Sequence, residues 1–179
     1  MLPFIFGGPC MMKTYKMYYK SPIGLIEIIG TNEAIYSILF SEEDITEKFL
    51  LEETPSVVKA CYTQLDEYFK GYRRNFSFPY ALEGTGFQRT VWEALKEIPY
   101  AEKRSYKDIA ISIGNEKATR AVGNANGKNR LSIVLPCHRV IGSNGKLTGY
   151  AGGQWRKEWL LQHEHTYFED QGNNERMIY

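Results

Sequence analysis

A cysteine and a histidine stand side by side at Cys137 and His138, inside the pentapeptide Pro-Cys-His-Arg-Val. This pentapeptide follows an apolar run, residues 131–135, and precedes a glycine-rich stretch. A thiol at the end of a buried strand, beside an imidazole that can take its proton, has the parts of an activated thiolate nucleophile. Taken alone, a buried structural cysteine is the more common explanation, because free cysteines are among the most buried residues. The rest of the chain must decide between the two.

The composition favours a folded intracellular protein without a metal. The chain has 179 residues, 43% of them hydrophobic, which is enough for a real core. Its cysteines, Cys10, Cys61 and Cys137, are odd in number and widely separated, which does not predict a disulfide framework and suits a reducing cytoplasm. No CxxC pair occurs and all three histidines lie in the last third, so neither a metal nor another cofactor is expected.

The first twelve residues are expected to be an extension of the folded part. They carry an apolar patch at residues 2–6, but lack the basic segment and the apolar length of a signal peptide. Met11 or Met12 is an alternative translation start. No stretch approaches transmembrane length, so no membrane partner is expected.

The net charge of +1 is unevenly distributed along the chain. Residues 1–84 hold 8 basic and 11 acidic side chains, whereas residues 85–165 hold 13 basic and 7 acidic ones. Residues 166–179 hold 1 basic and 3 acidic ones. The basic excess coincides with the Cys-His motif and favours an anionic partner there, although charged surfaces are often merely solvated.

The pattern of elements predicts an α+β fold with a small N-terminal antiparallel-sheet domain at residues 1–84. Three β-rich runs, residues 15–19, 25–29 and 34–40, are separated by turn sequences and predict a meander. A helix follows from about Pro55 and ends near Gly71. We expect residues 75–86 to form a strand and then a linker.

The second domain, residues 85–165, is predicted to be mainly helical, with a tail at residues 166–179. Helices are expected after Thr85, after Ser105 as N-cap, and over residues 117–126. The last two, joined by a tight Gly-Asn turn, form a helix-turn-helix pattern. The apolar run before Cys137 is expected to be a buried strand.

The second helix of this pattern is rich in small residues, as a helix that enters a DNA groove requires. These residues are Ala118, Thr119, Ala121, Gly123 and Ala125. Close packing of one helix on another is the more frequent use of such residues. Arg120, in the middle of the small residues, is explained least well by packing alone.

A final helix is predicted over residues 154–165. Trp155 and Trp159 share one of its faces and are expected in the core. Glu164 is expected near its C-terminal end, where the helix dipole disfavours an acid. An acid at that position calls for a partner, such as a buried imidazole.

Several motifs together resemble the O6-alkylguanine-DNA alkyltransferase family, in order and at family-like spacing over about residues 85–165. They are Phe87-Gln88-Arg89-Thr90-Val91-Trp92, Ser105-Tyr106, Arg120-Ala121-Val122-Gly123, Asn129, Pro136-Cys137-His138-Arg139-Val140, Gly149-Tyr150-Ala151-Gly152-Gly153 and Lys157-Glu158-Trp159-Leu160-Leu161 with Glu164. Two departures stand out: Arg130 replaces the family's usual proline, and Leu135 the commoner isoleucine. The N-terminal part resembles the family more loosely.

The resemblance implies direct transfer of an alkyl group from O6 of guanine to Cys137, once per protein molecule. It gives His138 the role of a base acting through a water, Glu164 that of the carboxylate orienting His138, and Asn129 that of the amide holding the active-site turn. The implied partner is double-stranded DNA containing O6-alkylguanine, with O4-alkylthymine left open, bound by a monomeric protein.

The resemblance also implies how the damaged base is reached, because the alkylated atom is buried in the base stack and the nucleotide must be flipped out. Arg120 would fill the gap and Tyr106 would assist extrusion. The backbone carbonyls of Val140 and Cys137 would read the guanine amino group, and a loop containing Tyr150 and Ala151 would cover O6.

Two other functions remain open at the level of sequence. A cysteine hydrolase could use Cys137, His138 and Glu164 on a small ester or amide, and would turn over many times. A helix-turn-helix regulator or lesion sensor could keep Cys137 for structure alone, in which case replacing this cysteine would leave function intact.

Overall fold

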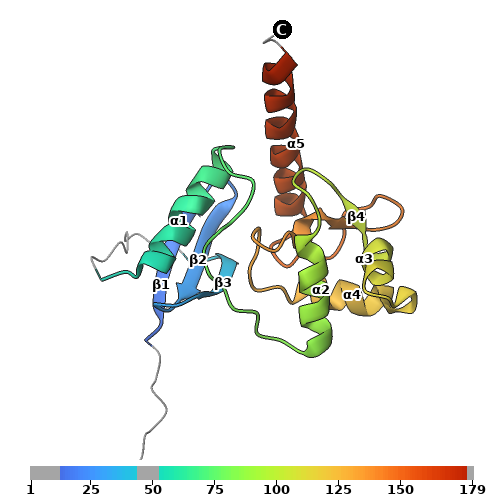
Figure 1. The fold of residues 1–179 in the computed structure, drawn as a ribbon, viewed down its shortest axis with the longest axis horizontal. Helices are drawn as coiled ribbons and strands as arrows, with labels where there is room; N and C mark the ends of the chain where they lie inside the picture. Colours follow the sequence, from blue (N-terminus) through green and yellow to red (C-terminus); the bar gives the residue numbers. More distant parts are fainter. Residues whose placement is uncertain (1–12, 44–52, 177–179) are drawn as a thin grey trace, which may run out of the picture.

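The computed structural model describes residues 13–43 and 53–176 of the chain. A three-stranded sheet with one helix forms the N-terminal part, and a mainly helical part lies beside it (Figure 1). The α+β class expected from the sequence is therefore confirmed. The expected extension at residues 1–12 lies outside the described residues. No helix of the described segments is both long and apolar enough to cross a membrane.

The N-terminal sheet is an antiparallel meander of β1 (Tyr15–Ser21), β2 (Gly24–Gly30) and β3 (Ile35–Ser41), in the order β1-β2-β3. Side chains alternate between buried and partly exposed along β1 and β2, so one sheet face supplies the core. The turn between β1 and β2 contains Gly24 at φ +113°, a conformation that favours glycine.

Helix α1 (Ser56–Phe69) covers the buried face of this sheet (Figure 1). Its buried residues recur at helical spacing: Val58, Cys61, Leu65, Tyr68 and Phe69. The helix ends at Phe69 with Lys70 as its C-cap, and Gly71 follows at φ +78°. The predicted helix and its glycine stop are thus confirmed.

The chain between the two parts does not contain the predicted strand. The described residues 75–86 form no regular strand and pair with the sheet at a single bridge, between Ile35 and Tyr80. The backbone of Ile35 bonds to Pro79 and Ala81 on either side of this bridge. Pro79 lacks an N–H and cannot donate to a ladder, which limits the pairing to this short contact.

The second part begins with α2 (Gly86–Lys96), followed by α3 (Tyr106–Ser112) and α4 (Thr119–Gly127). Thr85 and Ser105 cap α2 and α3 through reciprocal capping boxes with Gln88 and Asp108. A short 3₁₀ turn, η1 (Glu116–Ala118), precedes α4 and shortens the predicted second helix at its start. Helices α3 and α4 pack together on the side away from the N-terminal sheet (Figure 1).

The apolar run before Cys137 is a buried turn, so the predicted strand is wrong. Ile133 adopts φ +73°, and Leu135 donates back to the carbonyl of Leu131. Leu131 forms a bridge with Ile38 of β3, and the N–H of Ser132 donates to the Ile38 carbonyl, which ties the turn to the N-terminal sheet. A short apolar run predicts burial but does not distinguish a strand from a turn. The hydrophobic pattern therefore could not predict the backbone conformation here. A strand pair that was not predicted, β4 (Arg104–Ser105) with β5 (Val140–Ile141), closes the region.

Helix α5 (Gln154–Arg176) extends well past the predicted end at residue 165, into the expected tail. Glu164 therefore lies inside a helix and is not exposed to the unfavourable end of its dipole. The prediction for Trp155 is also wrong, because this side chain is 55% exposed whereas Leu160 and Lys157 are fully buried. The buried face of α5 instead carries Arg156, Lys157, Leu160, His163 and Glu164, with Trp159 partly buried against the core.

Candidate active site

The candidate nucleophile lies in a short 3₁₀ turn, η2 (Cys137–Arg139), between the buried turn and β5. Pro136 precedes η2, and the backbone N–H of Cys137 donates to Leu135 at 2.7 Å. The residue is only 4% exposed. Its thiol is thus held in a fixed direction by backbone that is itself buried.

Asn129 holds the thiol and the turn together. Its Nδ2 lies 3.1 Å from the Sγ of Cys137 and 2.9 Å from the carbonyl oxygen of Leu135. Its Oδ1 accepts from the backbone N–H of Leu131 at 2.9 Å. One amide therefore satisfies buried backbone groups of the turn and directs an N–H at the sulfur.

His138 and Glu164 form a fully buried pair. The Nε2 of His138 lies 2.7 Å from the Oε1 of Glu164, and both side chains are 0% exposed. The Nδ1 of His138 has no hydrogen-bond partner among the described residues. Donation of the Nε2–H to the carboxylate leaves the Nδ1 lone pair as the basic atom of the ring.

Glu164 accepts from three further residues besides its contact with His138. Arg139 donates to both carboxylate oxygens, from Nε at 2.9 Å and from NH2 at 3.0 Å. The hydroxyl of Tyr68 in α1 donates to Oε1 at 2.8 Å, and the backbone N–H of Ala101 donates to Oε2 at 3.1 Å. The carboxylate is therefore fully satisfied despite its burial.

These contacts set the charges of the pair. Burial alone would raise the pKa of Glu164, but His138 and Arg139 outweigh burial and hold that pKa well below its usual range. Burial also lowers the pKa of His138, against the opposing effect of Glu164. The resting state is an ionised Glu164 paired with Arg139, beside a neutral imidazole.

Cys137 is a protonated thiol at rest, with groups in place to stabilise its anion. Burial raises the pKa of this thiol, while Asn129 and the nearby Lys157 act in the opposite direction. Lys157 is completely buried and donates to the carbonyls of Val140 and Thr148 at 2.5 and 2.8 Å. Burial lowers the pKa of Lys157 to about 8. A base must therefore remove the thiol proton before the sulfur can attack.

The loop of residues 148–152, called here the active-site loop, lies beside the thiol. Tyr106 donates from its hydroxyl to the carbonyl of Thr148 at 2.8 Å. Tyr150 is half-buried, while Ala151 is exposed. Burial, and after it the proximity of Cys137, raises the pKa of Tyr150 well above its usual value. The sequence-predicted residues Tyr106, Tyr150 and Ala151 thus meet at one loop.

The small residues of α4 are divided between its surface and its packing side. Arg120 and Ala121 are exposed, whereas Ala118, Thr119 and Gly123 are half-buried. A Cβ at Gly123 would lie 3.9 Å from the Tyr106 ring, which is an ordinary contact. Helix packing therefore accounts for the half-buried small residues, whereas Arg120 and Ala121 face solvent.

The two carbonyls expected to read the guanine amino group already have protein partners. Val140 accepts from Lys157, and Cys137 accepts from Nδ2 of Asn126 at 3.3 Å. A carbonyl oxygen has two lone pairs, so each retains the capacity for a second donor.

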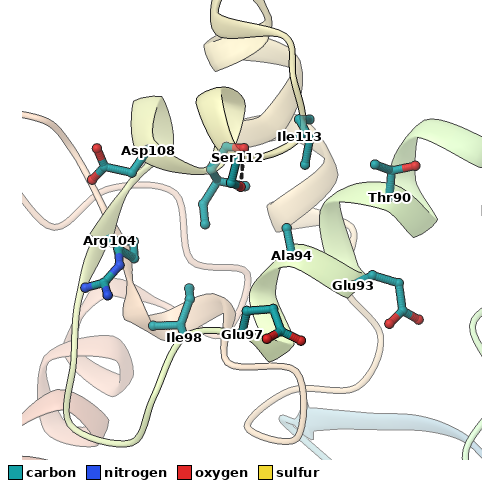
Figure 2. A pocket seen from close by; sticks show the side chains of 10 residues that line it. Thr90, Glu93, Ala94, Glu97, Ile98, Arg104, Asp108, Ser112 and Ile113 are labelled. Atoms are coloured by element: carbon teal, nitrogen blue, oxygen red, sulfur yellow. Dashed lines mark hydrogen bonds between the residues drawn. The ribbon is translucent and has the colours of Figure 1, made fainter.

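A groove of about 490 Å³ lies elsewhere, between α2 and α3 (Figure 2). Glu93, Glu97 and Asp108 line it, and Arg104 is its basic residue. Neither Cys137 nor any other residue of the candidate site reaches this groove, and its acidic lining is unsuited to a polyanion. Within residues 13–43 and 53–176, no cluster of three or more metal-ligating side chains is found.

Sequence reasoning missed four residues that complete the site. Arg139 and Lys157 belong to the quoted motifs but were given no role. A cation directly after His138 could have indicated that Arg139 contacts the same carboxylate. Tyr68 lies far from the Cys-His motif in sequence, and Arg156 lies on a face of its helix that was not expected to be buried. The contact of Tyr68 with Glu164 and that of Arg156 with the active-site loop depend on the tertiary fold.

Together, the fold and the site define a protein with a buried cysteine nucleophile, backed by an imidazole–carboxylate pair and flanked by an exposed helix-turn-helix. Comparison with family models narrows this class. Residues 86–166 match the 6-O-methylguanine DNA methyltransferase, DNA binding domain, and residues 14–82 match the ribonuclease-like domain of the same enzyme. The chain belongs to the 6-O-methylguanine DNA methyltransferase family.

Individual proteins agree with the family assignment. The methylated-DNA–protein-cysteine methyltransferase of Methanosarcina acetivorans is 47% identical over 152 residues, covering 84% of this chain and 97% of the relative. The constitutive enzyme of that name from Bacillus subtilis is 44% identical, covering 84% and 95%. The crystal structure of Mycobacterium tuberculosis O6-methylguanine methyltransferase has a TM-score of 0.76 at 40% identity, covering 87% and 94%. A DNA complex of the M. tuberculosis protein has a TM-score of 0.76 at 42% identity, covering 85% and 93%.

Proposed function

We propose that this protein repairs DNA by direct reversal, moving the alkyl group of O6-alkylguanine irreversibly to Cys137. The observation that carries the proposal is the buried thiol beside the His138–Glu164 pair, with the Asn129 amide 3.1 Å from its sulfur. The names of the relatives, which are methylated-DNA–protein-cysteine methyltransferases, support it. A thioether has no easy route back to a thiol, so each molecule acts once.

The proposed chemistry balances within the site. Nδ1 of His138 takes the proton of Cys137 through a bridging water, and the thiolate attacks the alkyl carbon in line with the O6–carbon bond. A carbon–sulfur bond forms, the carbon–oxygen bond breaks, and the electron pair stays with guanine. The guanine anion then takes up a proton at its ring nitrogen, so the net proton transfer is from thiol to base. Glu164 stabilises the imidazolium only partly, because Arg139 already shares its charge.

DNA binding follows from the basic second part and from α4. Phosphate contacts supply affinity without reading sequence, which suits a lesion that occurs in any context. Arg120, exposed in the first turn of α4, fills the place of the flipped nucleotide, and Tyr106 assists extrusion beside the active-site loop. Val140 and Cys137 accept from the guanine amino group, and the Ala151 N–H contacts O6.

The finer points of the proposal concern lesion, assembly and location. The protein acts as a monomer on double-stranded DNA carrying O6-alkylguanine, and O4-alkylthymine is a second substrate to be tested. A free thiol that is consumed by repair suits the reducing cytoplasm.

Intact-mass measurement after incubation with a duplex containing O6-methylguanine tests the proposal. We expect a gain of one methyl group per protein, assigned by peptide mapping to Cys137. Cys137→Ser should abolish transfer and leave DNA binding intact, because serine lacks a thiolate of comparable nucleophilicity. Cys61→Ala is the matched control, since Cys61 is the other buried free cysteine of the described chain and lies in α1. An unmodified wild-type protein that nevertheless binds the duplex would contradict transfer.

A further inference from the structure

Arg156, in the first turn of α5, connects the active-site loop to the N-terminal sheet. Its Nε donates to the carbonyl of Ile23 in the β1–β2 turn at 2.8 Å. Its NH1 donates to the carbonyl of Gly152 at 2.8 Å. NH1 and NH2 also contact Oε1 of Glu42 at 3.2 and 3.1 Å. One planar guanidinium thus bonds to two segments of the N-terminal part and to the end of the loop.

Two aromatic rings pack close to the guanidinium of Arg156. Its central carbon lies 4.7 Å from the ring centroid of Phe40 and 4.7 Å from that of Trp155. The exposed Trp155, unexplained as a core residue, therefore has a local partner. Arg156 is only 9% exposed, although its side chain is charged.

The same phenylalanine of β3 packs directly on the active-site loop. The rings of Phe40 and Tyr150 meet edge to face, with centroids 6.4 Å apart. A Cβ at Gly152 would come within 2.6 Å of the Phe40 ring, so the loop backbone approaches the ring as closely as glycine allows. The opposite end of the loop, Thr148, is held from the second part by Tyr106 and Lys157. The second part therefore bonds to both ends of the loop, and the N-terminal part adds the Phe40 ring at the Gly152 end.

We propose that Arg156, seated on Phe40 and Glu42, is a positioning residue that sets the active-site loop against Cys137 and thereby selects the size of the alkyl group transferred. This inference rests on the proposed function. The N-terminal part, which contributes no reacting group, acts through this contact on the loop that lies beside Cys137. Misplacement of a positioning group by about 1 Å can cost roughly 100-fold in rate.

The test compares Arg156→Met with Arg74→Met. Met keeps much of the apolar stem and loses the donors. Arg74 is the matched control, because it lies over Tyr100 and Phe168 at 5.3 Å each and so also joins the two parts, away from the loop. The readouts are the single-turnover transfer rate at saturating protein, for duplexes with O6-methylguanine and with O6-benzylguanine, the affinity for undamaged duplex, and Tm.

For Arg156→Met we expect a transfer rate about 10-fold lower or more and a changed ratio of benzyl to methyl transfer, at unchanged affinity for undamaged duplex. Arg74→Met should keep the wild-type ratio even where its Tm falls as much. Arg156→Lys should follow Arg156→Met, because an ammonium does not reproduce the planar fork. Equal ratios in wild type, Arg156→Met and Arg74→Met would overturn the inference.

A second pair keeps the test decisive if Arg156→Met does not fold. The side chain of Glu42 is 85% exposed, so Glu42→Lys should fold while repelling the guanidinium, and Glu33→Lys is the control for charge reversal at an exposed site on the same domain. A changed ratio in Glu42→Lys alone supports the inference, and unchanged ratios in both overturn it. If the wild-type protein transfers no alkyl group, both the proposed function and the inference fail. If it transfers the group and every variant keeps the wild-type ratio, only the inference is overturned.

Discussion

At the scale of single residues, the site combines a protonated thiol with a neutral base whose carboxylate partner is shared. Arg139 satisfies much of the charge of Glu164, which keeps that carboxylate ionised in a fully buried position. The carboxylate is then available mainly to orient His138 and to fix its tautomer. The lowered pKa of His138 and the raised pKa of Cys137 keep the imidazole and the thiol uncharged at rest. Because the thiolate and not the thiol is the nucleophile, the resting Cys137 stays unreactive until a substrate is aligned with it and its proton is removed.

The depressed pKa values of Glu164 and His138 predict loss of stability on acidification. The unfolded chain binds a proton at His138 below about pH 6.5, and at Glu164 below about pH 4.5, where the folded protein resists both. His163, whose pKa is also lowered by burial, contributes with the same sign. Tm should therefore fall as the pH is lowered from 7.5 through 6.5, and more steeply below 4.5. A Tm that is flat or rises over this range would contradict the charge assignment.

Glu164→Gln isolates the contribution of this carboxylate to the pH dependence of Tm. At neutral pH it leaves the buried Arg139 without a carboxylate, which should cost about 3–5 kcal/mol of stability. Below pH 4.5 its Tm should fall less steeply than that of wild type, because the titrating carboxylate is gone. Glu158→Gln, an exposed position on the same helix, is the control and should stay within about 0.5 kcal/mol of wild type.

At the scale of elements, the site depends on short irregular segments held by regular ones. The capped helices α2 and α3 could be predicted to within a few residues, because Thr85 and Ser105 carry local capping signals. The buried turn before Cys137 could not, because Ile133 at φ +73° is stabilised by partners from β3 and Asn129 that local sequence does not reveal. For α5, the position of Glu164 could be predicted but the end of the helix could not.

The exposed side of α4 gives a prediction at this scale. Ala121→Glu places a negative charge beside Arg120 on the proposed DNA-facing surface, so the affinity for undamaged duplex should fall by about tenfold or more, with Tm nearly unchanged. Ser56→Glu adds the same charge at the exposed start of α1 and should leave DNA affinity unaltered. Electrophoretic shift or fluorescence anisotropy at fixed salt measures both. Equal losses in the two variants would show that net charge, and not the surface of α4, controls binding.

At the scale of the whole molecule, the N-terminal part is coupled to the chemistry although it supplies no reacting group. Tyr68 reaches Glu164, Ile38 bonds to the turn at residues 130 and 132, and Arg156 bonds back to Ile23. Arg130, the departure from the family's usual proline, is exposed, and its carbonyl accepts from Ile38. Motifs in the second part were sufficient to predict Cys137, His138, Asn129 and Glu164. The contacts between domains were not predictable, because they join residues up to 133 positions apart.

The stoichiometry of repair tests the central claim most directly. A fixed amount of wild-type protein is titrated with an excess of duplex containing O6-methylguanine, and the restored guanine is counted after the reaction stops. One lesion repaired per protein molecule, with no further repair on longer incubation and all methyl groups recovered on Cys137, is the predicted result. Repair that continues beyond one lesion per molecule, or methyl groups released as a free product, would contradict the assignment of Cys137 as a consumed acceptor.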